Sequence, residues 1–144
     1  MNVELYYEEI TEGMALPTLR KHPTTKQLVK WAGVSEDFFE IHYDKDYALS
    51  QGLPSVIVQG DLTCAFLSQL LTDWIGEKGT IRKMKTSNRQ IVLQNEDLIC
   101  EGRVVKKYSE GTENFVECEI WARNTKGEKC TVGNVIITLP SKDA

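Results

Sequence analysis

The sequence predicts an α+β fold in which an antiparallel β-sheet wraps around one long central helix. Residues 61–76, DLTCAFLSQLLTDWIG, would place apolar side chains on nearly every side of a helix, which is typical of a buried helix. Segments that alternate apolar and polar residues follow it, as strands with one buried face do. A sheet that follows a buried helix must cover that helix, so both are expected to share one core.

Capping signals predict where the helices begin and end. Thr24 as N-cap and Gln27 at the third helical position form a capping box, and the helix that follows is expected to end at Gly33. The buried helix has Asp61 at its start and Gly76 at its end, as capping preferences favour. Two helices are therefore predicted in the first half of the chain.

The second half predicts three or four long antiparallel strands, over residues 81–93, 98–108, 115–124 and 130–139. Between the last two, residues 124–127, NTKG, are typical of a hairpin turn. No repeat or linker divides the chain, so residues 1–144 are expected to form a single domain, with the last few residues, SKDA, loose.

Composition narrows the classes of function. The net charge of −4 argues against a nucleic-acid partner, which would need a clustered basic face. The sequence has neither a signal-peptide pattern at its start nor an apolar stretch of the roughly 20 residues that a membrane span needs. The four cysteines are widely spaced and are interpreted as reduced. A cytoplasmic protein without a membrane partner is expected.

Asp37 and His42 are the first candidates for chemistry. They lie five residues apart after a helix end, so both side chains can converge if the loop curls. A carboxylate beside an imidazole makes an acid–base pair, because histidine titrates near neutral pH and the carboxylate fixes its tautomer. The alternative is that His42 forms hydrogen bonds within an acidic surface loop. A metal site is not expected, because His22 is distant and no cysteine stands at ligand spacing.

Gln59 and Gly60 are the second candidates, because they come where an aliphatic run meets the buried helix. Glycine allows close approach of the backbone to a ligand, and first-turn N–H groups have no partner within the helix. Together with the helix dipole they can form an oxyanion-type site. The alternative is that Gly60 only permits a tight turn.

Basic residues cluster at Arg82, Lys83, Lys85 and Arg89, and again at Arg103, Lys106 and Lys107. Such clusters are usually solvated faces. The first cluster is also a candidate for binding the phosphates of a carrier such as coenzyme A.

Taken together, these motifs resemble the MaoC-like dehydratases, the (R)-specific enoyl-CoA hydratases of the hotdog fold. Their pattern Ser-Gly-Asp-x-Asn-Pro-aliphatic-His corresponds to residues 35–42, SEDFFEIH, followed by Asp44 and Tyr47-Ala48. Their aliphatic run and His/Gln-Gly pair correspond to residues 58–60, VQG, and a Pro-Val-x-x-Gly-Asp-x-Leu motif is loosely matched by residues 91–98. The resemblance covers roughly residues 3–139, in the family's order.

The resemblance implies a single hotdog domain that hydrates a trans-2-enoyl thioester or dehydrates the 3-hydroxyacyl product. Asp37 and His42 would hold a water molecule and move its proton, and the Gly60 N–H would bind the thioester oxygen. The substrate would be carried by coenzyme A or an acyl-carrier protein, with no separate cofactor. Edge-to-edge pairing of sheets, as in other hotdog proteins, would give at least a homodimer.

The sequence also departs from the family pattern. Glu36, Phe39 and Glu40 stand where the family has glycine, asparagine and proline. This change motivates a rival interpretation, a non-catalytic hotdog subunit that completes a heteromeric dehydratase. A third interpretation is an acyl-CoA thioesterase that uses a carboxylate and the same helix-end oxyanion site.

Overall fold

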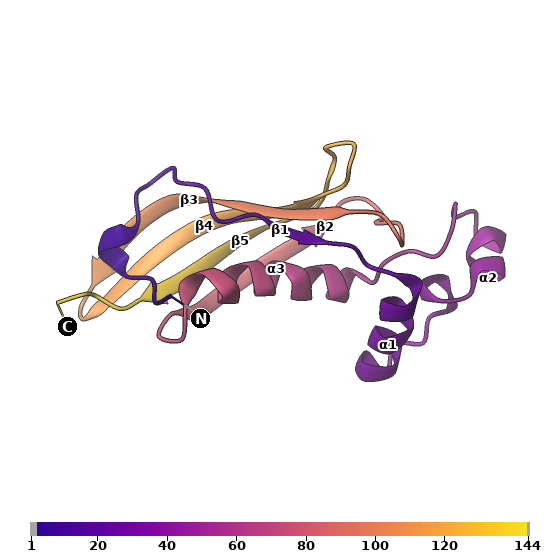
Figure 1. Ribbon diagram of the computed structural model, residues 1–144, viewed down its shortest axis with the longest axis horizontal. Coiled ribbons are helices and arrows are strands. Elements are labelled where there is room, and N and C mark those ends of the chain that lie inside the picture. Colours follow the sequence, from indigo (N-terminus) through magenta and orange to yellow (C-terminus); the bar gives the residue numbers. More distant parts are fainter. Residues whose placement is uncertain (1–2, 144) are drawn as a thin grey trace.

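The computed structural model describes residues 3–143 and confirms the predicted sheet around a central helix (Figure 1). In chain order the elements are η1 (Tyr7–Glu9), β1 (Leu19–Lys21), α1 (Thr25–Ser35), η2 (Glu40–His42), α2 (Lys45–Ser50), α3 (Gly60–Ile75), β2 (Thr80–Asn88), β3 (Leu98–Glu110), β4 (Glu113–Arg123) and β5 (Lys129–Leu139). Among the described residues no helix is both long and apolar enough to cross a membrane.

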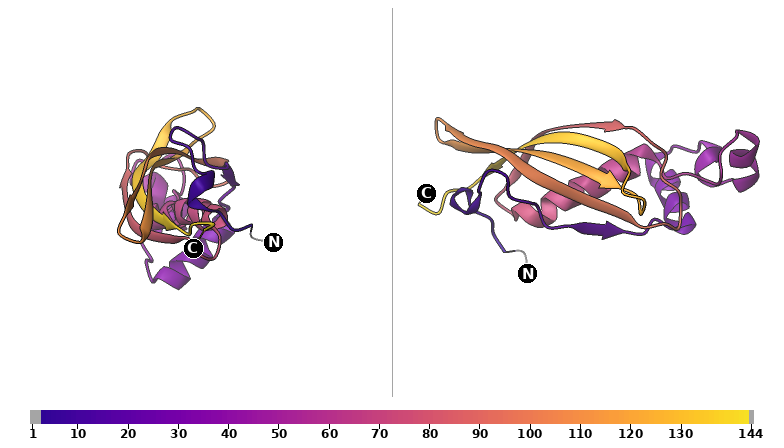
Figure 2. Two further views of the ribbon diagram at one scale, coloured as in Figure 1. Left: turned by 90° about the vertical axis from the view of Figure 1, so that its left-hand side faces the viewer. Right: turned by 90° about the horizontal axis from the view of Figure 1, so that it is seen from above.

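The five strands form one antiparallel sheet in the order β1-β3-β4-β5-β2. Helix α3 lies along its concave face (Figures 1 and 2). Alternate residues of β4 point inward and are buried: Val116, Cys118, Ile120 and Ala122. They pack in one core with the buried residues of α3: Leu62, Phe66, Leu67, Leu70, Leu71 and Ile75. The alternating pattern of the sequence is therefore the direct cause of this core.

Several predicted boundaries were wrong. Helix α1 continues past Gly33 to Ser35, because Glu36 ends it in the left-handed conformation, with φ 59°. Gln59 is the N-cap of α3, so Asp61 lies in the first turn. The strand predicted to reach residue 93 ends at Asn88. The short elements β1, α2 and the two 3-10 helices were not predicted.

Other local predictions are confirmed. The Thr24 hydroxyl accepts a hydrogen bond from the Gln27 N–H at 3.3 Å, as an N-cap does. The hairpin turn is closed by the Gly127 N–H and the Asn124 carbonyl at 3.0 Å.

At the other end of the molecule, Ser141 bonds the Glu8 carboxylate and the Lys142 N–H donates to it at 3.1 Å. Ala144, part of the tail expected to be loose, lies outside the described residues.

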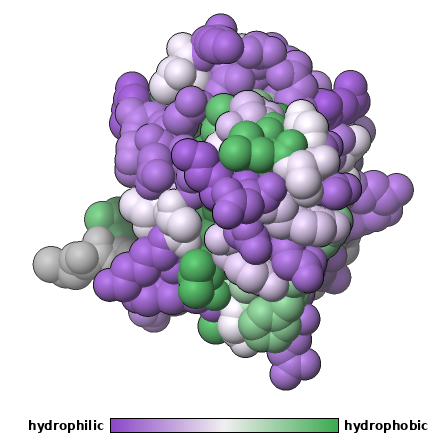
Figure 3. Space-filling model, turned by 90° about the vertical axis from the view of Figure 1, so that its right-hand side faces the viewer, coloured by the Kyte–Doolittle hydropathy of each residue, from purple (hydrophilic) through white to green (hydrophobic). Residues whose placement is uncertain are grey.

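Helices α1 and α2 lie beyond one end of the sheet, on the side where α3 begins (Figures 1 and 2). Figure 3 shows this end of the molecule, where apolar side chains interrupt a largely polar surface. Phe38 and Phe39 are exposed here, at 58% and 48%. Both side chains therefore lie outside the core.

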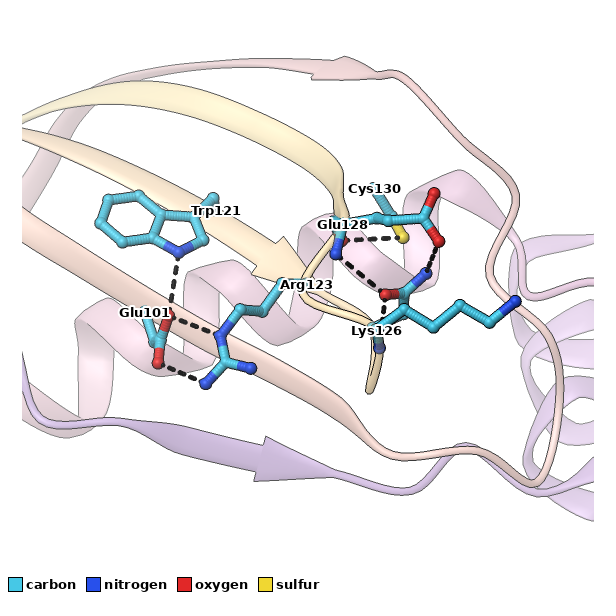
Figure 4. A network of polar contacts seen from close by, with 7 residues as sticks. Glu101, Trp121, Arg123, Lys126, Glu128 and Cys130 are labelled. Atoms are coloured by element: carbon cyan, nitrogen blue, oxygen red, sulfur yellow. Dashed lines mark hydrogen bonds and ion pairs between the residues drawn. The ribbon is translucent and has the colours of Figure 1, made fainter.

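The outer face of the sheet carries polar contacts instead of a second layer. Arg123 donates two hydrogen bonds to the Glu101 carboxylate, at 2.9 and 3.0 Å, and the Trp121 indole N–H donates a third at 3.0 Å (Figure 4). Asn124 organises the adjoining turn, because its Oδ1 accepts from the N–H groups of Lys126 and Glu128. The contacts of Glu101 join β3 to β4, and those of Asn124 fix the β4–β5 turn.

Candidate active site

His42 is held in place from two sides. It is 8% exposed, and its Nδ1 lies 2.8 Å from the Ile57 carbonyl oxygen. Because a carbonyl only accepts hydrogen bonds, Nδ1 must carry the proton. Nε2 of a neutral His42 then keeps its lone pair, and no described residue bonds it. The Phe39 ring also packs at nearly a right angle to the imidazole, with an interplanar angle of 89° and ring centroids 6.1 Å apart.

The segment that carries Ile57 connects His42 to the start of the central helix. The Ile57 N–H donates to the Ile41 carbonyl at 3.1 Å, so residues 41–42 and Ile57 bond each other reciprocally. On its other side this segment pairs with residues 92–93, and the Val58 N–H donates to the Val92 carbonyl at 2.8 Å. Two residues later the chain enters α3 at Gly60. The position of the imidazole relative to Gly60 is therefore set by backbone hydrogen bonds.

His42 and Gly60 line one cavity of about 310 Å³. Its other lining residues are Ile57, Val58, Thr63, Asn88, Arg89, Gln90, Ile91, Val92 and Thr131. Within the described chain the Gly60 N–H donates to no other group, as expected for the first position of a helix. The cavity thus combines a base with a free lone pair, an unused backbone donor at a helix start, and apolar walls.

Asp37 is not part of this cavity. It is exposed, and its Oδ1 accepts a hydrogen bond from the Phe39 N–H at 3.3 Å. No hydrogen bond joins Asp37 to His42 among the described residues. The expectation that the carboxylate fixes the imidazole tautomer is wrong in this structure, because the Ile57 carbonyl occupies Nδ1. A role for Asp37 in holding water stays a prediction.

Gln59 points away from the cavity. Its side chain is 2% exposed, and its Nε2 donates to the Leu28 carbonyl in α1 at 2.9 Å. The Gln59 Oε1 is buried and has no partner among the described residues. The side chain therefore ties α1 to the start of α3, and only the backbone of the Gln59-Gly60 pair reaches the candidate site.

The four basic candidates for phosphate binding do not converge within one chain. Arg89 lines the cavity beside His42, and no ion pair of the described residues involves it. Lys83 and Lys85 line a separate groove on the outer face of the sheet, with Glu117 and Glu119. Arg82 forms an ion pair with Glu113. Of the four, only Arg89 stands at the candidate site.

Asn88 and Thr131 also line the cavity, although neither was among the residues predicted from the sequence. They face each other across the β2–β5 ladder, and the Thr131 hydroxyl donates to Asn88 Oδ1 at 3.0 Å. Thr131 lies in an apolar strand segment, where a buried hydroxyl calls for a partner. That signal points to Thr131 but not to Asn88, because strand registry is not visible in the sequence.

A sheet wrapped around a buried helix, with a histidine and a helix start sharing a cavity at one end, defines a hotdog protein with a candidate acid–base site. The model of the MaoC-like domain family matches residues 9–123, more than half of the chain. The chain therefore belongs to the MaoC-like dehydratase family.

Known relatives agree with this assignment. The chain is 28% identical over 119 residues to the beta subunit of 3-oxo-4,17-pregnadiene-20-carboxyl-CoA hydratase from Mycobacterium tuberculosis, covering 83% of this chain and 89% of that one. The fold of this chain is similar to that of a chain in the ChsH1-ChsH2 complex from the same organism, with a TM-score of 0.80 and 22% sequence identity. The match covers 90% of this chain and 98% of that chain. The fold is also similar to that of the R-hydratase PhaJ1 from Pseudomonas aeruginosa (TM-score 0.87, 23% identity, 96% and 88% covered).

Proposed function

We propose that this chain is a hydro-lyase that adds water to, or removes it from, the 2,3-bond of an acyl thioester carried by coenzyme A or a carrier protein. The observation that carries the proposal is the placement of His42. Its Nδ1 is fixed by Ile57, its Nε2 is free, and it shares one cavity with the unused Gly60 N–H. Membership of the MaoC-like dehydratase family supports the same chemistry.

In the hydration direction, His42 Nε2 takes a proton from water while the water oxygen forms a bond to C3. The electron pair of the C2–C3 double bond moves toward C1, and the thioester oxygen gains negative charge. The Gly60 N–H, at the positive end of the α3 dipole, stabilises that charge. The proton taken by His42 then passes to C2, which completes the addition of one water molecule.

Although Asp37 does not line the cavity of this chain, we propose that it holds the attacking water. Its Oδ2 makes no hydrogen bond with a described residue, so one carboxylate oxygen is free to accept from a water molecule. Arg89, beside the cavity, is the proposed contact for a phosphate of the carrier. The coenzyme acts as part of the substrate, and no further cofactor is required by this chemistry.

We propose that the chain assembles through β2. This strand pairs with β5 on one side only, and most of its residues are exposed. An edge strand of this length offers unpaired backbone groups to a second sheet. Its partner is either a second copy or another hotdog chain, and sedimentation of the purified chain distinguishes a dimer from a monomer.

A second candidate is a non-catalytic subunit of a heteromeric dehydratase. The exposed position of Asp37, apart from His42, favours it. The relative from Mycobacterium tuberculosis that is a beta subunit of a hydratase favours it too. In that case the chain needs a second hotdog chain to turn over an enoyl thioester.

The deciding experiment measures hydration of 2-enoyl-CoA thioesters, from short to bulky acyl groups, by loss of the enoyl ultraviolet band. His42→Ala and Asp37→Asn are run beside the unmodified protein. Turnover that collapses in both variants supports the hydro-lyase. Turnover that survives in both contradicts the roles proposed for His42 and Asp37. No turnover without a second hotdog chain supports the subunit, and release of free thiol identifies a thioesterase.

A further inference from the structure

The cavity is lined by the Asn88 amide, which belongs to an exposed residue and is oriented by one hydrogen bond and by its contact with Gly60. Asn88 is the last residue of β2, and its Oδ1 accepts a hydrogen bond from the hydroxyl of Thr131, which is only 1% exposed. A Cβ atom placed on Gly60 would overlap Asn88 Nδ2 but would lie 3.7 Å from Asn88 Oδ1. The NH₂ side of the amide therefore faces Gly60.

The Asn88 NH₂ group has spare donors. It donates to no acceptor among residues 3–143, whereas the Oδ1 atom of the same amide is engaged by Thr131. The Gly60 N–H is unused in the same way. Two donors from different elements, β2 and the start of α3, thus lie side by side in the cavity that holds His42.

We propose that Asn88 Nδ2 donates a second hydrogen bond to the thioester oxygen bound by the Gly60 N–H. This inference rests on the proposed function, because it concerns the charge that hydration puts on that oxygen. An oxyanion is stabilised by preorganised donors, and the removal of one side-chain donor from such a site typically lowers kcat about 10²–10³-fold. Thr131 acts as a positioning residue, because its hydroxyl donates its hydrogen bond to the Asn88 amide.

A larger residue at position 60 would disturb this contact. A methyl group at position 60 would overlap Asn88 Nδ2 and push the amide out of place. The backbone conformation of Gly60 is helical, so any residue could adopt it. A side chain at position 60 would therefore be accommodated only by moving the end of the Asn88 side chain.

The experiment uses a conjugated aromatic enoyl-CoA thioester whose absorption band moves to the red when its carbonyl accepts hydrogen bonds. The full-length protein is compared with Asn88→Ala, Thr131→Val and the control Asn134→Ala, which removes an exposed asparagine on the outer face of β5. We expect the red shift to be lost in Asn88→Ala and reduced in Thr131→Val. We also expect kcat for enoyl-CoA hydration to fall about 10²-fold in Asn88→Ala, with KM changed less than about threefold.

The outcomes separate the two proposals. Hydration and red shift unchanged in Asn88→Ala would overturn the role of Asn88 and leave the hydro-lyase intact. A protein that neither hydrates nor shifts the band would overturn both. If Asn88→Ala does not fold, by circular dichroism, Thr131→Val decides, because valine keeps the packing and loses only the hydroxyl. An unchanged red shift and an unchanged kcat in Thr131→Val would then contradict the proposal that Thr131 orients the Asn88 amide toward the thioester oxygen.

Discussion

His42 Nδ1 donates a hydrogen bond to the carbonyl oxygen of Ile57 at 2.8 Å. This contact separates two roles of one side chain. Nδ1 holds residues 41–42 against the segment that leads into α3, whereas Nε2 is free for chemistry. A substitution that keeps the first role and removes the second should therefore isolate the base.

His42→Asn is that substitution. The asparagine NH₂ group can replace Nδ1–H as donor to Ile57, but asparagine has no basic nitrogen. We expect unfolding by urea to show a loss of less than about 1 kcal/mol, while hydration falls on the order of 10²–10⁴-fold. His42→Ala leaves the Ile57 carbonyl unpaired and should cost about 1–3 kcal/mol of stability. Equal hydration activity in His42→Asn and the unmodified protein would refute the proposal that His42 is the general base.

Gln59 is expected to matter for stability and not for substrate binding. Gln59→Met keeps the length of the side chain but removes the donor to the Leu28 carbonyl, which lies in a buried helix turn. The Leu28 carbonyl keeps its helical partner, the Ala32 N–H, so the variant loses one buried hydrogen bond worth about 0.5–1.5 kcal/mol, and the urea midpoint should fall by a corresponding amount. KM for the thioester should be unchanged in the protein that remains folded. A raised KM at full stability would mean that the side chain contacts substrate.

The sequence predicted the central helix and three or four long strands because apolar periodicity records which face is buried. Val116 and Cys118 alternate with Glu117 and Glu119, and that alternation alone defines the inner face of β4. The pairing of Asn88 with Thr131 was beyond such reasoning, because it depends on the register between β2 and β5. The partner of His42 was also beyond it, because a backbone carbonyl such as that of Ile57 carries no signal in the side-chain sequence.

Two substitutions, one in α1 and one at its C-cap, are expected to stabilise the protein. Gly33 lies inside the helix, and nothing lies within 4 Å of the place that an alanine methyl group would take, so Gly33→Ala should add up to about 1 kcal/mol. Glu36 has φ 59°, which favours glycine, so Glu36→Gly should add roughly 0.5–1 kcal/mol. Asn95→Gly is the control for the second change.

Asn95 also has φ 59°, but asparagine tolerates this conformation better than glutamate does. Asn95→Gly should therefore raise the stability of the protein less than Glu36→Gly does. Thermal melts of the two variants measure this difference. An equal gain at both positions would show that left-handed strain at Glu36 is not the cause.

The buried thiols should make the fold sensitive to alkali. Burial raises the pKa of Cys100 and of Cys118 to about 12. An unfolded thiol ionises first, near its ordinary pKa of about 8.5–9. The contribution of these two thiols should therefore be constant below about pH 9, and stability should fall between about pH 9 and 12, as measured by urea midpoints. At pH 8 a disulfide reagent should label Cys64 before these two, and Cys64→Ser should remove the fast phase.

Acid should weaken the contact between Glu101 and Arg123. The two hydrogen bonds from Arg123 hold the pKa of the Glu101 carboxyl below its ordinary value, against the opposing effect of burial. The stabilisation is therefore present above the pKa of the unfolded glutamate and is lost as pH falls through the folded value. Glu101→Gln should cost about 1 kcal/mol at pH 7 and progressively less below about pH 4.5.

Glu119→Gln is the matched control for this prediction. Glu119 pairs with Arg103 on the same two strands at 2.8 Å, but both side chains are about half exposed, and no indole joins the pair. A single exposed pair of this kind contributes about 0–1 kcal/mol, so Glu119→Gln should change the urea midpoint less than Glu101→Gln at every pH. The two differ because Glu101 accepts three hydrogen bonds at once and its pair is less exposed. Equal losses in both variants would mean that charge pairing alone, without the Trp121 contact and partial burial, accounts for the effect.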